Sequence, residues 1–224
     1  MPTLEEDIKK RVKEQLRWDD RVMASDINVE VDRGIVRLSG SVPSYASLRN
    51  AEVDALSVRG VNGIDNQLVI SYHTEVEVPT DAEIEDFVNK MYRFNENLSS
   101  DEITVISENG YITLSGSTSA LWKKLLAEEL CHSVRGVVEV TNEITIVPTG
   151  SLGDENIANT IMAALERDAY TDQDSIIVRV ENGIVSLSGT SNSRMGELKA
   201  EAIASQTEGV IEVVNEIESV RSNT

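Results

Sequence analysis

Apolar residues recur along the chain with two alternating periods. Near the start, Ile8, Val12 and Leu16 are four residues apart, which is typical of the buried face of an amphipathic helix. Further on, apolar and polar residues alternate over residues 27–31, which predicts a strand with one buried face. The pattern therefore predicts a helix followed by a half-buried strand at the start of the chain.

The same two patterns return twice. The later helices are predicted from Ile84, Val88 and Met91, and from Ile157, Ile161 and Leu165. The strands after them are predicted from Ile103 and Val105, and from Ile176, Val178 and Val180. Three copies of one pattern indicate a tandem repeat of a small domain.

Two glycine motifs place the three copies in one register. The first motif is carried by "VDRGIVRLSG", "SENGYITLSG" and "VENGIVSLSG", and the second by "RGVNGIDNQL", "RGVVEVTNEI" and "EGVIEVVNEI". The leading glycines are Gly34, Gly110 and Gly183 in the first motif, and Gly60, Gly136 and Gly209 in the second. These two glycines are 26 residues apart in every copy (60 − 34, 136 − 110, 209 − 183). Successive copies are offset by 76 and then 73 residues (110 − 34, 183 − 110), without internal gaps.

The first motif predicts a hairpin and its returning strand. Asn-Gly at 109–110 and 182–183 is a two-residue turn signal, because both central residues of such a turn need a positive φ. Arg33-Gly34 fills the same place less well. At the far end of the motif, we expect Gly40, Gly116 and Gly189 to let the chain turn out of the strand.

A second helix and a third strand complete each copy. Small residues mark the helix and would let it lie close to a sheet: Ala51 and Ala55, Ala127 and Cys131, and Ala200 and Ala204. The last strand follows the second glycine motif and carries Ile64 and Leu68, Val140 and Ile144, and Val213 and Ile217. We therefore predict an α+β protein of three tandem α-β-β-α-β domains, at residues 1–73, 78–148 and 151–224. Each is expected to be a three-stranded mixed sheet with two helices on one face, because the second helix connects parallel strands by a crossover.

The amino-acid composition and the net charge exclude several classes of structure and function. Aromatic residues are 4% of the 224, so the cores must consist mainly of aliphatic side chains, and a single cysteine excludes an intramolecular disulfide. A net charge of −19 argues against binding to nucleic acid. No segment is long and apolar enough to span a membrane, and the N-terminus is not a secretory signal. We expect a cytoplasmic protein as the sequence is written, and a periplasmic one if an export signal has been removed.

The repeated motifs resemble those of the BON domain, a family named for a bacterial osmotic-stress protein and nodulation proteins. Its pattern is a Gly-x-Val-x-Leu-x-Gly strand, an Ala-rich helix and a Gly-Val-x-x-Val-x-Asn-x-Leu strand. The matching segments are residues 34–40 and 60–68, 110–116 and 136–144, and 183–189 and 209–217. The resemblance implies a non-enzymatic binding module of osmotic or envelope stress. Some members are thought to bind phospholipid, and one cytoplasmic member resembles a potassium sensor.

Few residues suggest chemistry. Cys131 and His132 are adjacent, but consecutive helical residues point about 100° apart, so they are poorly placed as nucleophile and base. We expect no enzymatic activity and no cofactor. No metal ligands are named, because a potassium site would use backbone carbonyls, which a sequence does not reveal.

The recurring asparagines Asn66, Asn142 and Asn215 fall on the apolar face of the last strand. A side-chain amide buried there must be hydrogen-bonded. It either ties down a neighbouring loop or helix end, or contacts a ligand.

Charge is unevenly distributed among the copies. Residues 1–74 carry 10 basic and 12 acidic residues, whereas residues 75–148 carry 5 and 14, and residues 149–224 carry 5 and 13. Lys9, Lys10, Arg11 and Lys13 in the first helix are candidates for contact with anionic lipid or a protein partner, or form a solvated helix face. The leading hypothesis is a tandem BON-type protein of the stress class that engages phospholipid or a partner surface. The alternatives are a potassium-binding stress sensor and a purely structural adaptor, and the sequence indicates no oligomeric state.

Overall fold

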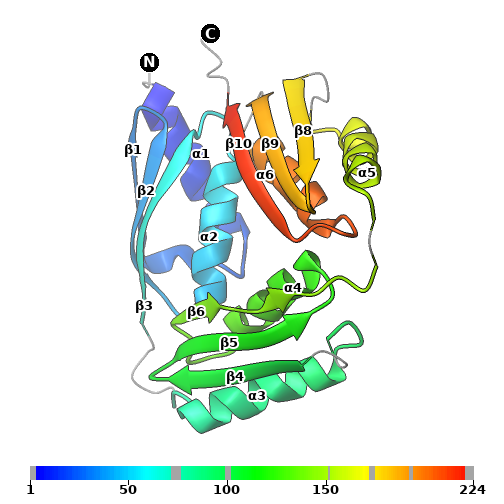
Figure 1. Ribbon diagram of the computed structural model, residues 1–224. Helices are drawn as coiled ribbons and strands as arrows, with labels where there is room; N and C mark the ends of the chain where they lie inside the picture. Colours follow the sequence, from blue (N-terminus) through cyan, green and yellow to red (C-terminus); the bar gives the residue numbers. More distant parts are fainter. Residues whose placement is uncertain are drawn as a thin grey trace. The chain divides into compact units, whose positions relative to one another are not determined.

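The computed structural model describes residues 4–71, 77–98, 102–150, 152–171, 175–191 and 194–219. The predicted order α-β-β-α-β occurs three times along them, which confirms the α+β class (Figure 1). The first repeat contains α1 (Leu4–Trp18), the 3-10 helix η1 (Ala24–Asp26), β1 (Ile27–Asp32), β2 (Ile35–Val42), α2 (Tyr45–Ser57) and β3 (Gly63–Ile70). The second contains α3 (Asp81–Phe94), β4 (Glu102–Glu108), β5 (Tyr111–Thr118), α4 (Leu121–His132), β6 (Glu139–Asn142) and β7 (Thr145–Ile146). The third contains α5 (Asp154–Arg167), β8 (Ile176–Glu181), β9 (Ile184–Ser191), α6 (Arg194–Gln206) and β10 (Glu212–Ser219).

The chain divides into two compact units, and each combines one terminal repeat with part of the middle one. The first unit holds residues 1–91, 105–113 and 129–141, and the second holds residues 92–104, 114–128 and 142–224. The first repeat therefore lies wholly within one unit and the third repeat wholly within the other.

The sheets are mixed, as predicted. In the first repeat the strand order is β1-β2-β3, with β1 antiparallel to β2 and β2 parallel to β3. The third repeat has the same pairing, with β8 antiparallel to β9 and β9 parallel to β10. The middle repeat has the order β4-β5-β6, and its last strand is interrupted, since β7 resumes at Thr145 and pairs parallel with β5. The second helix of each terminal repeat thus connects two adjacent parallel strands.

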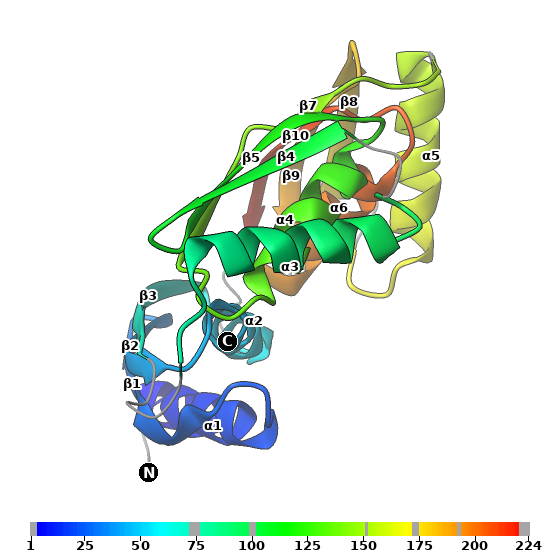
Figure 2. The ribbon, with the colours of Figure 1, turned by 90° about the horizontal axis from the view of Figure 1, so that it is seen from below.

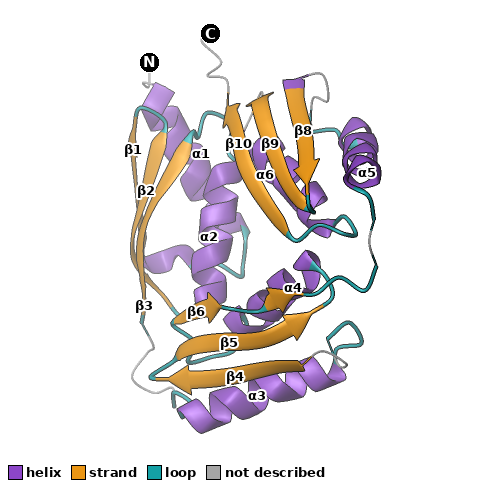
Figure 3. Cartoon of the chain, in the orientation of Figure 1, coloured by secondary structure: helices purple, strands orange, loops and turns teal. Residues whose placement is uncertain are grey.

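Both helices of the first repeat lie on one face of its sheet, as Figure 1 and Figure 2 show from two directions. Between them is an aliphatic core: Ile8, Val12, Leu16, Val22, Val29, Val36, Leu38, Val42, Ala51, Ala55, Val61 and Leu68. In the third repeat α6 packs on β9 and β10 in the same way (Figure 3). The core of the third repeat contains, among others, Ile157, Ile161, Leu165, Val185, Leu187, Ala200 and Ala204. Ala51 and Ala55 of α2 and Ala200 and Ala204 of α6 have no exposed surface, because there the helices approach their sheets closely.

In the middle repeat, one predicted core position is shifted by a residue. Met91 is only half-buried, and the next residue, Tyr92, is 6% exposed. The hydroxyl of Tyr92 donates a 2.7 Å hydrogen bond to the Ala127 carbonyl. A buried phenol needs such a partner, so α3 is connected to α4 through this bond.

The hairpin turns have the backbone that was predicted for them. Both turn residues of each hairpin have positive φ: Arg33 (50°) and Gly34 (80°), Asn109 (55°) and Gly110 (81°), and Asn182 (52°) and Gly183 (77°). Arginine in this conformation is less favourable than asparagine, whose short polar side chain tolerates it better.

A feature that was not predicted joins the start of α3 to the hairpin of its own repeat. The carboxylate of Asp81 accepts hydrogen bonds from Asn109 N at 2.8 Å, Gly110 N at 2.9 Å and Ser107 Oγ at 2.7 Å. Amides in a turn with two positive φ angles have no partner within the hairpin itself, so an acceptor from another element is needed. We call this contact the carboxylate clamp.

The carboxylate clamp recurs in the other repeats. Asp154 at the start of α5 accepts from Asn182 N at 2.9 Å and from Gly183 N at 3.0 Å. In the first repeat Glu5 accepts from Arg33 N at 2.9 Å. Each first helix is therefore connected to a turn about 28 residues later in the chain.

The glycines at the end of the first motif act differently from the prediction. Gly40, Gly116 and Gly189 do not end their strands, because β2, β5 and β9 each continue for two more residues. Their φ angles are 114°, 120° and 110°. At each position a Cβ would collide with a backbone carbonyl, that of Asp26, Glu102 or Ser175 respectively. Close approach of the chain where the neighbouring strand begins, rather than an exit from the sheet, accounts for these glycines.

The leading glycines of the second motif lie against the first helix of their own repeat. A Cβ at Gly60, Gly136 or Gly209 would lie 3.0, 2.8 or 2.9 Å from Cδ1 of Ile8, Ile84 or Ile157 respectively. All three also have positive φ. The motif thus marks where the loop before the last strand passes over the start of the first helix.

Candidate functional site

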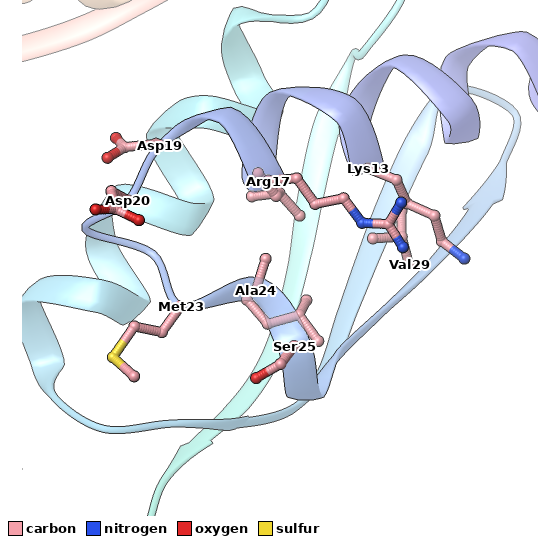
Figure 4. A pocket seen from close by; sticks show the side chains of 10 residues that line it. Lys13, Arg17, Asp19, Asp20, Met23, Ala24, Ser25 and Val29 are labelled. Carbon is pink, nitrogen blue, oxygen red and sulfur yellow. The ribbon is translucent and has the colours of Figure 1, made fainter.

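A surface depression of about 340 Å³ lies in the first repeat, beside the C-terminal half of α1. Its lining residues are Lys13, Leu16, Arg17, Asp19, Asp20, Met23, Ala24, Ser25, Ile27 and Val29 (Figure 4). They come from α1, from the turn after it, from η1 and from β1. We use the name α1 surface for Lys13, Arg17 and Met23, which line the depression, together with Trp18, which follows Arg17 in the sequence.

Three basic residues follow one face of α1 towards this depression. Lys9, Lys13 and Arg17 are spaced four residues apart, so their side chains lie one helical turn above another. None of the three forms an ion pair with a residue that the structure describes. Figure 4 shows the side chains of Lys13 and Arg17 on the same side of the helix. Arg17 is exposed, whereas Lys9 and Lys13 are half-buried.

The other two predicted contact residues have intramolecular partners. Arg11 pairs with Asp7 at 2.8 Å, and Lys10 lies 3.8 Å from Glu14. Both are i, i+4 pairs on the same helix, and such exposed pairs contribute about 0.3–0.5 kcal/mol. The predicted cluster of four thus divides into Lys9 and Lys13 on one side and the paired Lys10 and Arg11 on the other.

Two exposed apolar side chains follow the basic row in the sequence. Trp18, the last residue of α1, is 79% exposed, and Met23 in the turn after it is 53% exposed. Met23 also has a positive φ of 51°, which residues other than glycine rarely adopt. The sequence analysis missed both, although a tryptophan just beyond Leu16, the last core position of the helix, was a visible signal.

The turn that carries Met23 is built around Asp19. Its carboxylate accepts from the Arg21 backbone amide at 2.9 Å and from Arg21 Nη2 at 2.6 Å. These bonds to Arg21 lower the pKa of Asp19 to about 2. From α2, Ser47 Oγ donates a 2.7 Å hydrogen bond to the Arg21 carbonyl, which ties the turn to the second helix.

The middle repeat presents a similar pair at the same place. Arg93 and Phe94 lie 76 residues after Arg17 and Trp18 (93 − 17, 94 − 18), and Phe94 is 82% exposed. The third repeat has Glu166 and Arg167 there instead. An exposed aromatic beside an arginine is thus a property of two repeats.

In the second and third repeats, the asparagine of the last strand makes hydrogen bonds to the second helix. Asn142 Nδ2 donates to the Lys124 carbonyl at 2.9 Å and to Glu128 Oε2 at 3.1 Å. Asn215 Nδ2 donates to Glu201 Oε2 at 3.0 Å and, more weakly, to the Glu197 carbonyl at 3.4 Å.

All three asparagines also accept from a backbone amide two residues later: Asn66 from Leu68, Asn142 from Ile144 and Asn215 from Ile217. The three side chains are half-buried. These contacts fit the tethering alternative, with the body of the helix as the attachment in the second and third repeats.

No catalytic arrangement is evident among the residues that the structure describes. Cys131 is fully buried, and the ring of His132 stacks on that of Tyr45 with centroids 4.0 Å apart. His73 lies outside the described residues. No described group of three or more His, Cys, Asp or Glu could hold a metal ion, and no described helix is long and apolar enough to cross a membrane.

Comparison with known proteins places these features in a family. The sequence profile of the BON domain matches residues 5–72, 80–148 and 153–221. The chain is 28% identical over 131 residues to the osmotically-inducible protein Y of Escherichia coli (strain K12), covering 56% of the chain and 65% of that protein. It is 30% identical over 122 residues to the 21 kDa hemolysin of Actinobacillus pleuropneumoniae, covering 54% of the chain and 62% of that protein. Each match thus spans less than two thirds of the relative.

Among solved structures, two of CdsD, a structural protein of the type III secretion system of Chlamydia trachomatis, align with 96% and 98% of the chain. These alignments cover 92% and 100% of the CdsD chains. Their sequence identities are 14% and 12%, and both TM-scores are 0.27. Similarity at this level supports no conclusion about function.

Proposed function

The chain belongs to the BON domain family, and on that basis we propose that it is a non-enzymatic stress protein that binds anionic phospholipid through its first repeat. The family match covers most of the chain in three copies, which we place at residues 1–73, 78–148 and 151–224. The name of the osmotically-inducible relative supports a role in osmotic stress.

The observation that carries the lipid proposal is the exposure of Trp18 at the end of the helix that carries Lys13 and Arg17. Tryptophan is enriched at membrane–water interfaces, where its ring sits at the level of the headgroups. Basic side chains near an anionic membrane contribute about 1 kcal/mol each. Met23 adds a flexible apolar side chain that adapts to an irregular surface. The α1 surface thus combines charge attraction with a small apolar insertion.

Charge distribution favours the first repeat over the others. Residues 1–74 are nearly neutral, with 10 basic and 12 acidic residues, whereas the remaining 150 residues carry 10 basic and 27 acidic ones. A surface of anionic lipid would repel the second and third repeats. Arg93 and Phe94 form a weaker second candidate, because that repeat is strongly acidic.

A titration with lipid vesicles tests the proposal through Trp18 itself. The chain has two tryptophans, so Trp122→Phe leaves Trp18 as the single fluorophore and Trp18→Phe is the matched control. Vesicles of phosphatidylglycerol and phosphatidylethanolamine should shift the Trp18 emission to shorter wavelength, and phosphatidylcholine vesicles should not. The control with only Trp122 should show no shift. An unchanged Trp18 spectrum together with no co-sedimentation would exclude this function.

Two alternatives remain as outcomes of the same experiment. A protein that ignores vesicles but melts at a higher temperature in potassium than in sodium, at equal ionic strength, would be a potassium-binding sensor. A protein that responds to neither would be a structural adaptor.

A further inference from the structure

Two carboxyl groups are buried together where the end of α1 meets α2. Asp19 is 7% exposed and Asp54 is 8% exposed. Asp54 Oδ1 accepts a 3.2 Å hydrogen bond from Gln15 Nε2 of α1. Asp54 Oδ2 is also buried and has no hydrogen-bond partner among the described residues. A carboxyl oxygen in this position is costly unless it carries a proton or gains a partner.

Asp54 faces one negative and one positive side chain, and the positive one is already bound to Asp19. The two side chains belong to Asp19 and Arg21, both in the turn after α1, whereas the contact from α1 itself is the neutral Gln15. Arg21 is committed to Asp19, with three side-chain hydrogen bonds of 2.6–3.1 Å. Burial raises the pKa of Asp54, and the neighbouring Asp19 carboxylate raises it further. The two carboxyls are therefore driven in opposite directions, which is typical of a pair that holds one proton.

The other repeats show that the fold does not need a carboxyl at this position. Leu130 and Ile203 occupy the places that correspond to Asp54, at offsets of 76 and 73 residues (130 − 54, 203 − 130). Both are partly buried apolar side chains on α4 and α6. Asp19, by contrast, has an equivalent in each repeat, because Asn95 and Asp168 also accept from the amide two residues later. The unusual member of the pair is Asp54.

We propose that Asp54 is a proton-binding switch for the α1 surface. With its proton, Asp54 donates from Oδ2 to the Asp19 carboxylate and fastens the turn of residues 19–23 to α2. Without the proton, Asp54 and Asp19 are two neighbouring buried carboxylates that share one arginine, Arg21. Their repulsion loosens the turn. Because that turn carries Met23 and directly follows Trp18, the last residue of α1, binding should be tighter when Asp54 is protonated. Only this last step rests on the proposed lipid function.

The proton-binding step is tested on the protein alone. The ¹³C chemical shift of the Asp54 carboxyl, followed against pH, should give a midpoint above the ordinary value of 3.8. A midpoint at or below 3.8 would overturn the proposal, whatever the protein does with lipid.

Two substitutions test the coupling to the turn. Asp54→Asn keeps the size of the side chain and carries a permanent donor, so it imitates the protonated form. Asp54→Leu introduces the side chain that Leu130 has at this position in the second repeat, so this variant should fold normally. In the parent, the Trp18 emission of the Trp122→Phe protein should change across the Asp54 midpoint without lipid. Both variants should lose that change, and its persistence in either would contradict the switch.

Vesicle binding tests the regulatory step. Between pH values below and above the Asp54 midpoint, the affinity of the parent for phosphatidylglycerol vesicles should fall about tenfold. That change corresponds to a rise of one unit in the pKa of Asp54 on binding. Other carboxylates contribute to the fall, so the measured quantity is the ratio of parent to Asp54→Asn at each pH. A constant ratio would overturn the regulation. If no form binds vesicles, the lipid function fails, while the titration and the fluorescence still decide the proton switch.

Discussion

The carboxylate of Asp81 accepts a 2.9 Å hydrogen bond from the backbone amide of Gly110, 29 residues further along the chain. This bond joins the first turn of α3 to the turn of the hairpin between β4 and β5. The same connection recurs from Asp154 and, with a longer side chain, from Glu5. It shows why an acidic residue and a glycine turn occur together in every repeat.

The carboxylate clamp should make the middle repeat sensitive to acid. Hydrogen bonds from Ser107, Gly110 and Asn109 lower the pKa of Asp81 below its ordinary 3.8. A group with a lowered pKa stabilises the folded state above its unfolded pKa, and that stability is lost as pH falls through the folded pKa. We expect Asp81→Asn to reduce amide-exchange protection of this repeat at neutral pH but not at strongly acidic pH. A difference that does not shrink on acidification would contradict this explanation.

The clamp of the third repeat offers a simpler test at neutral pH. Asp154→Ala removes the two carboxylate oxygens that accept hydrogen bonds from the backbone amides of Asn182 and Gly183. A hydrogen bond of this kind contributes about 0.5–1.5 kcal/mol, so we expect a loss of about 1–3 kcal/mol from the free energy of unfolding. Urea unfolding followed by signals from the third repeat would measure it. Asp154→Glu should recover part of the loss, because Glu5 makes this contact in the first repeat.

Valine at Gly116 or Gly189 should destabilise the repeat that contains it. The positive φ and the carbonyl of the neighbouring strand leave no room for a branched side chain. Strain of this kind costs about 1–3 kcal/mol. Gly150 is the matched control, because nothing lies within 4 Å of a Cβ placed there. Equal thermal melting of Gly116→Val and Gly150→Val would show that the strand contact is unimportant.

A pair of substitutions tests the contact between Gly209 and Ile157. Gly209→Ala should be destabilising, because the new methyl group would lie 2.9 Å from Ile157 Cδ1 in a backbone of positive φ. Ile157→Val removes that Cδ1 atom. In a double-mutant cycle, we expect an interaction energy of about 0.5–3 kcal/mol that partly offsets the single losses. Strict additivity of the two effects would mean that only backbone strain matters.

The division of the basic residues predicts two different responses to charge removal. Changing Lys9, Lys13 and Arg17 to Gln should greatly weaken co-sedimentation with anionic vesicles, because these side chains form no described ion pairs. Changing Lys10 and Arg11 to Gln should have a small effect, because both have acidic partners on α1. High salt should imitate the first variant, since charge attraction acts only within a Debye length. If each variant weakens co-sedimentation in proportion to the three or two charges that it removes, the arrangement on the helix is irrelevant and only total charge counts.

Local patterns in the sequence were sufficient for the architecture. The four-residue spacing of Ile8, Val12 and Leu16 and the alternation in the strands reflect periods that the backbone itself imposes. The Asn-Gly turns were predictable for the same reason, because the requirement for positive φ lies within two adjacent residues. The glycine and aliphatic motifs are weak evidence singly, but their recurrence in three copies at the same spacing made the prediction of the repeated domain reliable.

Relationships between distant segments could be recognised only in the tertiary structure. Gly40 was expected to release the chain from the strand, yet its role is set by the Asp26 carbonyl, at the end of η1 just before the neighbouring strand begins. The bond from Asp81 to Gly110 and the pairing of Asp54 with Asp19 join residues 29 and 35 positions apart (110 − 81, 54 − 19). Periodicity describes which face a side chain occupies. It does not describe which residue of another element meets that face, because that depends on how helices and strands pack in three dimensions.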